Sequence, residues 1–208
     1  MTRGYDQAKR PFDLAVATVL LVLTLPIQVV TALAIRSRLG RPVVFRQTRP
    51  GLHGEPFEIF KFRTMLEIDP ALNLVDDASR MRPLGRWLRA TSLDELPTLW
   101  NVIRGDMSLV GPRPLRMHYL ELYSAAQARR NEVRPGLTGL AQVTGRNSLS
   151  WEDRLRLDVD YVNHYTFLGD LKILGDTVLY VLSRKGIAPE GEVTMPEFLG
   201  TDNKEESA

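Results

Sequence analysis

Two adjacent carboxylates, Asp94 and Glu95, follow Ser92 at the expected start of a helix, and Arg113 lies between two prolines a short way along the chain. Carboxylates can hold a Mg²⁺ ion that also binds phosphate oxygens, and an ionised aspartate can act as a nucleophile. The flanking prolines restrict the backbone of Arg113, so its guanidinium can contact a phosphate with little further loss of entropy. These residue types predict chemistry on a phosphate group.

The same residues also fit a purely structural use. The run from Ser92 to Glu95 matches a capping box, in which Ser92 caps the helix and Glu95 reaches back to the chain before it. Free N–H groups at a helix start attract anions, so a cap and a phosphate site are compatible. We expect these N–H groups and nearby arginines to keep Asp94 ionised at neutral pH. Arg113 could equally pair with a surface carboxylate, and the sequence leaves both uses open.

Asp158 and Asp160 are a second pair of acids to consider. They resemble the acidic pair with which many nucleotide-sugar glycosyltransferases bind metal, and such an enzyme would transfer the sugar directly and release UDP. Residues two apart do not share a helix face, so we expect both to be solvated helix charges instead. The three histidines show no ligand spacing and the chain has no cysteine, so zinc sites, thiolate nucleophiles and disulfides are not indicated.

A long apolar segment, Leu14 to Ile35, precedes these residues and contains Pro26 near its middle. Its 22 residues could span a bilayer as one straight helix. A central proline removes a backbone hydrogen bond, and Thr24 and Gln28 could satisfy the groups that it frees. Basic residues flank the segment on both sides, which indicates that both ends lie on the cytoplasmic side. We therefore predict a re-entrant helix, break and helix, in preference to a straight span or a buried core helix.

Charge divides the chain unevenly, although the formal net charge is only +2. Residues 1–65 carry ten Lys/Arg against four Asp/Glu, a net charge of +6, and the remainder carries seventeen against twenty-one, a net charge of −4. Basic side chains beside an apolar segment favour anionic phospholipid head groups. No nucleic-acid recognition motif accompanies them, so we predict a phospholipid membrane as a partner and no nucleic acid.

The remaining patterns predict an α+β fold in which residues 1–40 form the membrane hairpin, 41–200 a small, mainly helical cytoplasmic domain, and 201–208 a disordered tail. Two short β-like runs joined by a Pro-Gly turn predict a hairpin over 42–47 and 57–63. A polar stretch over 70–82 predicts a surface loop, and 136–147 is expected to be loop and short strand. Helices are predicted over 84–89, from Ser92, from a capping box at 124–127, over 150–165 and over 170–185.

Together the motifs resemble those of the monotopic bacterial sugar transferases, the polyprenyl-phosphate phosphoglycosyl transferases, in their minimal catalytic form. The likeness extends from Lys9 to Phe198 and rests on an ordered series: 9–13 (KRPFD), 45–51 (FRQTRPG), 60–65 (FKFRTM), 92–97 (SLDELP), 100–102 (WNV), 105–108 (GDMS), 111–114 (GPRP) and 134–139 (RPGLTG). One departure is Leu25 before Pro26, where close relatives often carry serine, and this leaves the angle of the membrane hairpin open.

The resemblance implies transfer of a phospho-sugar from a UDP-sugar to a polyprenyl phosphate such as undecaprenyl phosphate, with release of UMP, as the first membrane step of glycoconjugate assembly. It implies that Asp94 attacks the β-phosphate to form a covalent intermediate and that Glu95 is its partner, held by Arg89. Both carboxylates would hold Mg²⁺. The further substrate-binding residues that it implies are Lys61, Arg63, Arg113 and Arg146.

The resemblance also implies a location at the cytoplasmic face of the bacterial inner membrane. Which sugar is carried, and in which pathway, cannot be read from the sequence. A homo-oligomer is left open because the amphipathic faces could serve lipid, core or a second subunit. An inactive, membrane-anchored scaffold remains the alternative to an enzyme.

Overall fold

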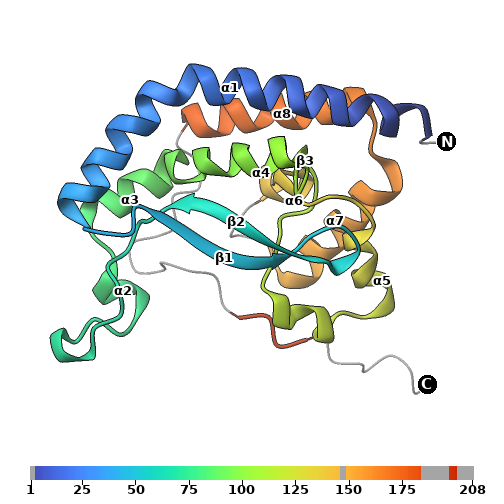
Figure 1. Cartoon of the computed structure of the whole chain (residues 1–208). Coiled ribbons are helices and arrows are strands. Elements are labelled where there is room, and N and C mark those ends of the chain that lie inside the picture. The colour runs from blue at the N-terminus through green and yellow to red at the C-terminus, as the bar shows by residue number, and fades with distance from the viewer. Residues whose placement is uncertain (1–2, 146–148, 184–196, 201–208) are drawn as a thin grey trace.

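The longest element is the N-terminal helix α1 (Arg3–Arg38), which runs along one edge of the molecule (Figure 1). The computed structural model describes residues 3–145, 149–183 and 197–200. Within these ranges, α1 is the one helix long and apolar enough to cross a membrane. Its exposed apolar side chains lie between residues 14 and 33: Leu14, Val19, Leu20, Val22, Leu23, Leu25, Ile27, Val29, Val30 and Leu33. This helix is compatible with membrane anchoring.

The predicted break at Pro26 is wrong at the level of the backbone, because α1 continues through this residue as one helix. Figure 1 shows that the helix bends along its length instead. Thr24 Oγ1 donates to the Leu20 carbonyl at 2.6 Å, and the Gln28 amide donates to Thr24 Oγ1 at 3.0 Å. Bonds of this kind, together with a proline, bend helices without interrupting them. The Thr24 and Gln28 side chains thus hydrogen-bond to each other and to the Leu20 carbonyl. They do not bind the Val22 carbonyl, which lacks its usual helical donor because Pro26 has no N–H.

The predicted hairpin is confirmed. Strands β1 (Val44–Pro50) and β2 (Pro56–Phe62) pair in antiparallel register from Val44 opposite Phe62 to Pro50 opposite Pro56. The short helix η1 (Leu52–Gly54) forms the connection, and Gly51 N–H donates to the Glu55 carbonyl at 2.7 Å to close it. Figure 1 shows the hairpin crossing the middle of the molecule, so that β2 can present side chains to the helices beside it.

A second pair of strands, β3 (Ser108–Val110) and β4 (Gly136–Thr138), is parallel. The chain between them forms η4 (Met117–Leu122), α5 (Ala125–Ala128) and η5 (Arg129–Glu132). The capping box predicted at Ser124 is confirmed, with Ser124 Oγ accepting from Gln127 N–H. The parallel pairing was not predicted, because neither run carries the length or alternation of an ordinary strand.

The other helices agree broadly with the sequence patterns. Helix α3 (Pro83–Ala90), α7 (Trp151–His164) and α8 (Phe167–Ser183) confirm three predictions. The segment predicted as a loop over 70–82 contains two short helices, η2 (Pro70–Leu72) and α2 (Asp77–Arg80), and the segment after β4 forms α6 (Leu140–Thr144). The predicted tail at 201–208 lies outside the described residues.

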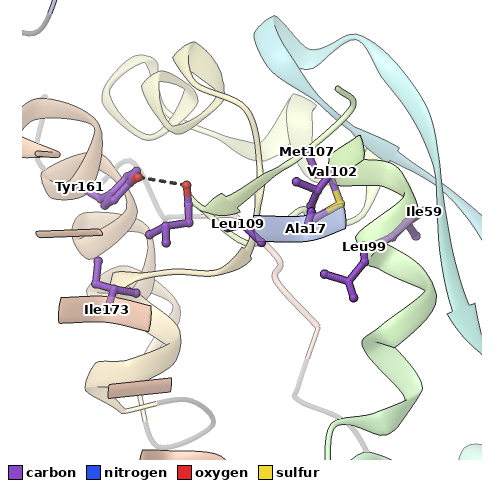
Figure 2. Close-up of a cluster of buried hydrophobic side chains, with 9 residues drawn as sticks. Ala17, Ile59, Leu99, Val102, Met107, Leu109, Tyr161 and Ile173 are labelled. Carbon is purple, nitrogen blue, oxygen red and sulfur yellow. Dashed lines mark hydrogen bonds between the residues drawn. The ribbon is translucent and has the colours of Figure 1, made fainter. Parts of the chain in front are cut away.

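The main core joins α1 to the domain that follows it. Figure 2 shows Ala17 of α1 beside Val102 and Met107, with Ile59 of β2 and Leu99 nearby. Tyr161 of α7 packs on the other side of this cluster, and its hydroxyl donates to the Val110 carbonyl of β3 at 3.0 Å. Because Ala17 of α1 is fully buried in this cluster, α1 is part of the same folding unit as the domain that follows it.

Candidate active site

Asp94 and Glu95 lie in a tight helical segment, η3 (Leu93–Thr98), which leads directly into α4 (Leu99–Arg104). Ser92, just before it, adopts a left-handed backbone conformation with φ 56°, and its side chain makes no cap hydrogen bond. The predicted capping box is therefore wrong. Left-handed backbone is uncommon outside glycine, and here it turns the chain sharply between α3 and η3.

Two polar side chains fix this segment against β2. Thr98 Oγ1 donates to the Phe60 carbonyl at 2.8 Å, and Asn101 Oδ1 accepts from Phe60 N–H at 3.0 Å. Asn101 Nδ2 also donates to the Glu58 carbonyl at 2.6 Å. The Asn101 side chain is fully buried, so these bonds replace the pairing that a neighbouring strand would supply. They bring Lys61 of β2 opposite the carboxylates.

Glu95 is held by two cations. Its Oε1 accepts from Lys61 Nζ at 2.6 Å and from Arg113 Nη2 at 2.8 Å. Burial opposes ionisation of this carboxyl, but the charges of Arg113 and Lys61 outweigh it and hold the pKa of Glu95 well below its usual range. Burial lowers the pKa of Lys61, while the charge of Glu95 acts in the other direction. Arg113 thus reaches the dyad, as its rigid setting between prolines suggested.

Asp94 has a different environment from its neighbour. It is 9% exposed, and within the described part of the chain its carboxylate has no hydrogen-bond or ion-pair partner. Burial and the negative charge of Glu95 raise the pKa of Asp94 to about 6. We expected helix N–H groups to stabilise the ionised form; the direction of the shift is the opposite, although the carboxyl is still mainly ionised at pH 7.

The other predicted residues, Arg89, Arg63 and Arg146, have three different outcomes. Arg89 of α3 lies beside the dyad, where its Nε donates to Thr64 Oγ1 at 3.0 Å and its charge acts on Asp94. Arg63 is buried, and its guanidinium donates to the carbonyls of Leu39 and Arg41, just after α1. Arg63 therefore ties the end of α1 to β2, a structural contact that the sequence did not suggest. Arg146 lies outside the described residues.

A cavity of about 2010 Å³ contains the dyad. One part of its wall is polar and includes Lys61, Arg89, Asp94, Glu95 and Arg113. Another part is apolar and comes from two neighbouring helices, through Val16 and Leu20 of α1 and through Leu174, Val178 and Val181 of α8. Figure 1 shows α1 and α8 side by side, and Phe12 of α1 packs edge-on against Phe167 of α8. The cavity can therefore receive a molecule with both a charged and an apolar part.

The dyad has the donors that a Mg²⁺ site requires. Asp94 and Glu95 are oxygen donors, and in the described residues neither the Asp94 oxygens nor Glu95 Oε2 are engaged by a cation. The described ranges contain no cluster of three or more His, Cys, Asp and Glu side chains suited to a metal. Mg²⁺ in phosphate chemistry usually takes one or two carboxylates together with substrate oxygens, so the pair fits such an ion.

The second acidic pair does not form a site. Asp158 is 2% exposed and pairs with Arg130 at 2.7 Å, whereas Asp160 is exposed and lies 2.9 Å from the ring of His164. The two residues do lie on different faces, as their spacing indicated. The prediction that Asp158 is solvated is wrong, because its partner comes from a distant part of the chain.

Sequence reasoning missed Asn101 and Arg130. The signal for Asn101 was a lone amide in an otherwise apolar run from Leu99 to Ile103, since a polar residue in such a run needs a partner when buried. No comparable signal marked Arg130, because the adjacent Arg129 has the same residue type and is exposed.

Comparison with known proteins identifies the family. The family model described as "Bacterial sugar transferase" matches residues 4–184. The Bacillus subtilis protein named "Uncharacterized sugar transferase EpsL" is 52% identical over 194 residues, covering 93% of this chain and 96% of EpsL. The UDP-glucose:undecaprenyl-phosphate glucose-1-phosphate transferase of Caulobacter vibrioides is 43% identical over 189 residues, covering 86% of this chain and 71% of that protein. The exopolysaccharide production protein ExoY of Rhizobium meliloti is 38% identical over 197 residues, covering 86% of this chain and 87% of ExoY. The chain belongs to the bacterial sugar transferases and is an enzyme.

Proposed function

We propose that this enzyme transfers a phospho-sugar from a UDP-sugar to a polyprenyl phosphate through a covalent intermediate on Asp94. The observation that carries the proposal is the contrast within the dyad: Glu95 is bound by Lys61 and Arg113, whereas the Asp94 carboxylate has no such partner in the described residues and lines the cavity. An unengaged, partly desolvated carboxylate beside fixed cations is suited to attack a phosphate that those cations bind.

Two displacements complete the reaction. In the first, an Asp94 oxygen attacks the β-phosphorus of the UDP-sugar, and the bond from that phosphorus to the bridging oxygen breaks, so that UMP leaves with the electron pair. In the second, an oxygen of the lipid phosphate attacks the same phosphorus and releases the Asp94 carboxylate. Arg113 and Lys61 would stabilise negative charge on the phosphate oxygens in both steps. A Mg²⁺ held by Asp94 and Glu95 would supply further neutralisation of phosphate charge.

The substrate classes come from the relatives and fit the cavity. The Caulobacter vibrioides relative is named for transfer of glucose 1-phosphate from UDP-glucose to undecaprenyl phosphate, and a Salmonella typhimurium relative is named undecaprenyl-phosphate galactose phosphotransferase. An amphiphilic acceptor of this kind has a charged head for the arginines and an isoprenoid chain for the apolar wall of α1 and α8. We infer a UDP-hexose donor, an undecaprenyl phosphate acceptor and a role in exopolysaccharide or capsule assembly.

The released nucleotide tests the reaction class. Purified protein in detergent is incubated with Mg²⁺, undecaprenyl phosphate and a panel of UDP-sugars, and the nucleotide product is identified. We expect UMP with at least one sugar and no turnover by Asp94→Asn. Asp160→Asn is a matched control, because Asp160 is an exposed carboxylate outside the cavity lining. Release of UDP, or turnover by Asp94→Asn equal to that of the unaltered enzyme, would contradict the proposal.

We also propose that α1 enters the inner membrane and returns to the cytoplasmic face. Both ends of the helix carry basic side chains, and the bend near its middle would direct the second half away from a straight span (Figure 1). The chain has no cysteine, so single-cysteine variants at the exposed residues Gln7 and Arg41 can be labelled cleanly. In intact spheroplasts, we expect both sites to be protected from an impermeant maleimide and to react after lysis. Labelling of Gln7→Cys from outside would contradict the re-entrant course.

A further inference from the structure

An ion pair at the wall of the cavity, which Asp158 helps to line, connects α7 to the segment that carries Arg113. Arg130 Nε and Nη2 donate to Asp158 Oδ2 at 3.0 and 2.7 Å. The two side chains are 1% and 2% exposed, so the pair is almost fully removed from water. Tyr123 completes the enclosure, because its hydroxyl accepts from Arg130 Nη1 at 3.3 Å and its ring lies 5.6 Å from the guanidinium carbon.

Arg130 makes one more bond, and this bond leads to the dyad. Its Nη2 donates to the backbone carbonyl of Arg113 at 2.6 Å. The side chain of Arg113 in turn donates to Glu95 Oε1 at 2.8 Å. A single chain of contacts therefore runs from Asp158 through Arg130 and the Arg113 backbone to Glu95.

The residues before Arg113 are also fixed by backbone contacts. Gly136 N–H donates to the Pro112 carbonyl at 2.9 Å, and Gly111 N–H donates to the Thr138 carbonyl at 2.9 Å. The approach is close: a Cβ atom on Gly136 would lie 2.1 Å from the Gly111 nitrogen. The strand pair thus holds Arg113 from one side, and Arg130 holds its carbonyl from the other.

A buried ion pair adds little net stability to a folded protein. Removing two charges from water offsets much of their attraction, and apolar side chains of similar volume often serve the fold as well. The bond from Arg130 to the Arg113 carbonyl is what an apolar replacement could not supply. We propose that Arg130, oriented by Asp158, is a positioning residue that aims Arg113 at the dyad and at the substrate phosphate. This inference depends on the proposed role of Arg113 as a phosphate contact.

The test separates positioning from folding. The double variant Arg130→Met, Asp158→Leu removes both charges together and keeps the space filled, so neither group is left buried and unpaired. We expect a melting temperature within a few degrees of the unaltered protein and a fall in kcat of roughly 10- to 100-fold, the scale expected when a substrate-positioning group shifts by about 1 Å. Arg130→Lys, which keeps a charge beside Asp158 but lacks the guanidinium fork, serves as a second variant and should fold and lose about tenfold. The matched control is Arg129→Met, a neighbouring exposed arginine paired with Glu132.

A double-mutant cycle supplies the readout that a structural role would not change. Arg113→Met should lower kcat by itself, and adding the Arg130 and Asp158 substitutions to it should cost no more than about a further twofold, because the group that they position is gone. In these variants the loss of activity should be shared between kcat and KM for the UDP-sugar in the same proportion as in Arg113→Met. Full activity in a folded double variant, or losses that multiply in the cycle, would overturn the positioning role. Full activity of Arg113→Met would instead overturn the proposed function of Arg113 itself.

Discussion

Asp94 and Glu95 are neighbours in the chain, yet their carboxyl groups have opposite electrostatic environments. Glu95 Oε1 binds both cations of the site, while Asp94 is desolvated and feels the negative charge of Glu95. Such a separation of pKa values commonly assigns different roles to two carboxyl groups in one site. On this basis Glu95 is a fixed charge that organises the cations, and Asp94 is the group available to react.

The raised pKa of Asp94 predicts the acid limb of the pH profile. A protonated carboxyl cannot attack phosphorus, so kcat/KM should fall as the pH is lowered through about 6. The measurement is kcat/KM from pH 4.5 to 8.5 at constant Mg²⁺. Lys61 lowers the pKa of Asp94, so Lys61→Met should move the limb to higher pH. A kcat/KM that stays nearly constant from pH 7 down to 4.5 in both proteins would show that burial does not control this carboxyl.

The same shift predicts that Asp94 is a source of instability. Its folded-state pKa lies above the ordinary aspartate value of 3.8, so ionisation destabilises the folded protein increasingly from about pH 4 to 6, and the full penalty is present above pH 6. Asp94→Asn should therefore be more stable than the unaltered protein at pH 8, by up to about 3 kcal/mol. The gain should shrink as the pH falls from 6 to 4. Thermal unfolding in detergent at pH 8 and pH 4.5 measures it, and an equal or lower melting temperature at pH 8 would contradict the account.

The element that matters most for the site is the short run from η3 into α4, because it docks both carboxylates against β2. Asn101 is central to this docking and is fully buried. Asn101→Ala should lower the free energy of unfolding by about 2–4 kcal/mol, since it leaves the Phe60 N–H and the Glu58 carbonyl unpaired. Denaturant unfolding measures the change, and Asn163→Ala on exposed surface is the control, with an expected effect within about 0.5 kcal/mol. An equal loss in the free energy of unfolding in the two variants would mean that Asn101 does not hold this segment against β2.

Elements defined by local patterns were predictable, whereas those defined by distant partners were not. The hairpin and the helices α7 and α8 follow from alternation, turn residues and helical spacing. Ser92 shows the limit, because its sequence fits a cap but tertiary packing places it in a left-handed turn. Asp158 shows a second limit. The spacing places Asp158 and Asp160 on different sides of the helix, but only the fold reveals that Asp158 is the one that binds Arg130, 28 residues away. For the site, the sequence indicated the dyad and Arg113 but not the contacts that hold them.

Across the whole molecule, a buried polar cluster joins α1 to α7 and α8. Asp170 at the start of α8 is 1% exposed and accepts hydrogen bonds from Tyr5 and Lys9 of α1 and from Tyr161 of α7. The contacts from Tyr5 and Tyr161 measure 2.5 and 2.8 Å. This cluster sets α1 alongside α8, and these two helices supply the apolar wall of the cavity.

Removing the charge of Asp170 should loosen this arrangement. Asp170→Asn leaves Lys9 without its counter-charge in a largely buried position, so we expect a loss of about 2–4 kcal/mol in the free energy of unfolding. Asp176→Asn, on the same helix and less buried, is the matched control and should change stability by less than about 0.5 kcal/mol. Thermal unfolding in detergent measures both variants. A loss no larger than that of the control would mean that the apolar contacts between α1 and α8 suffice.

The covalent intermediate is the most direct test of the central claim. The enzyme is incubated with its UDP-sugar and Mg²⁺ in the absence of any polyprenyl phosphate, quenched, digested, and the peptide that contains Asp94 is weighed by mass spectrometry. We predict release of UMP stoichiometric with enzyme and a sugar-phosphate adduct on Asp94, both absent in Asp94→Asn. An enzyme that transfers phospho-sugar at full rate with no adduct on Asp94, or that releases UDP, would contradict the account.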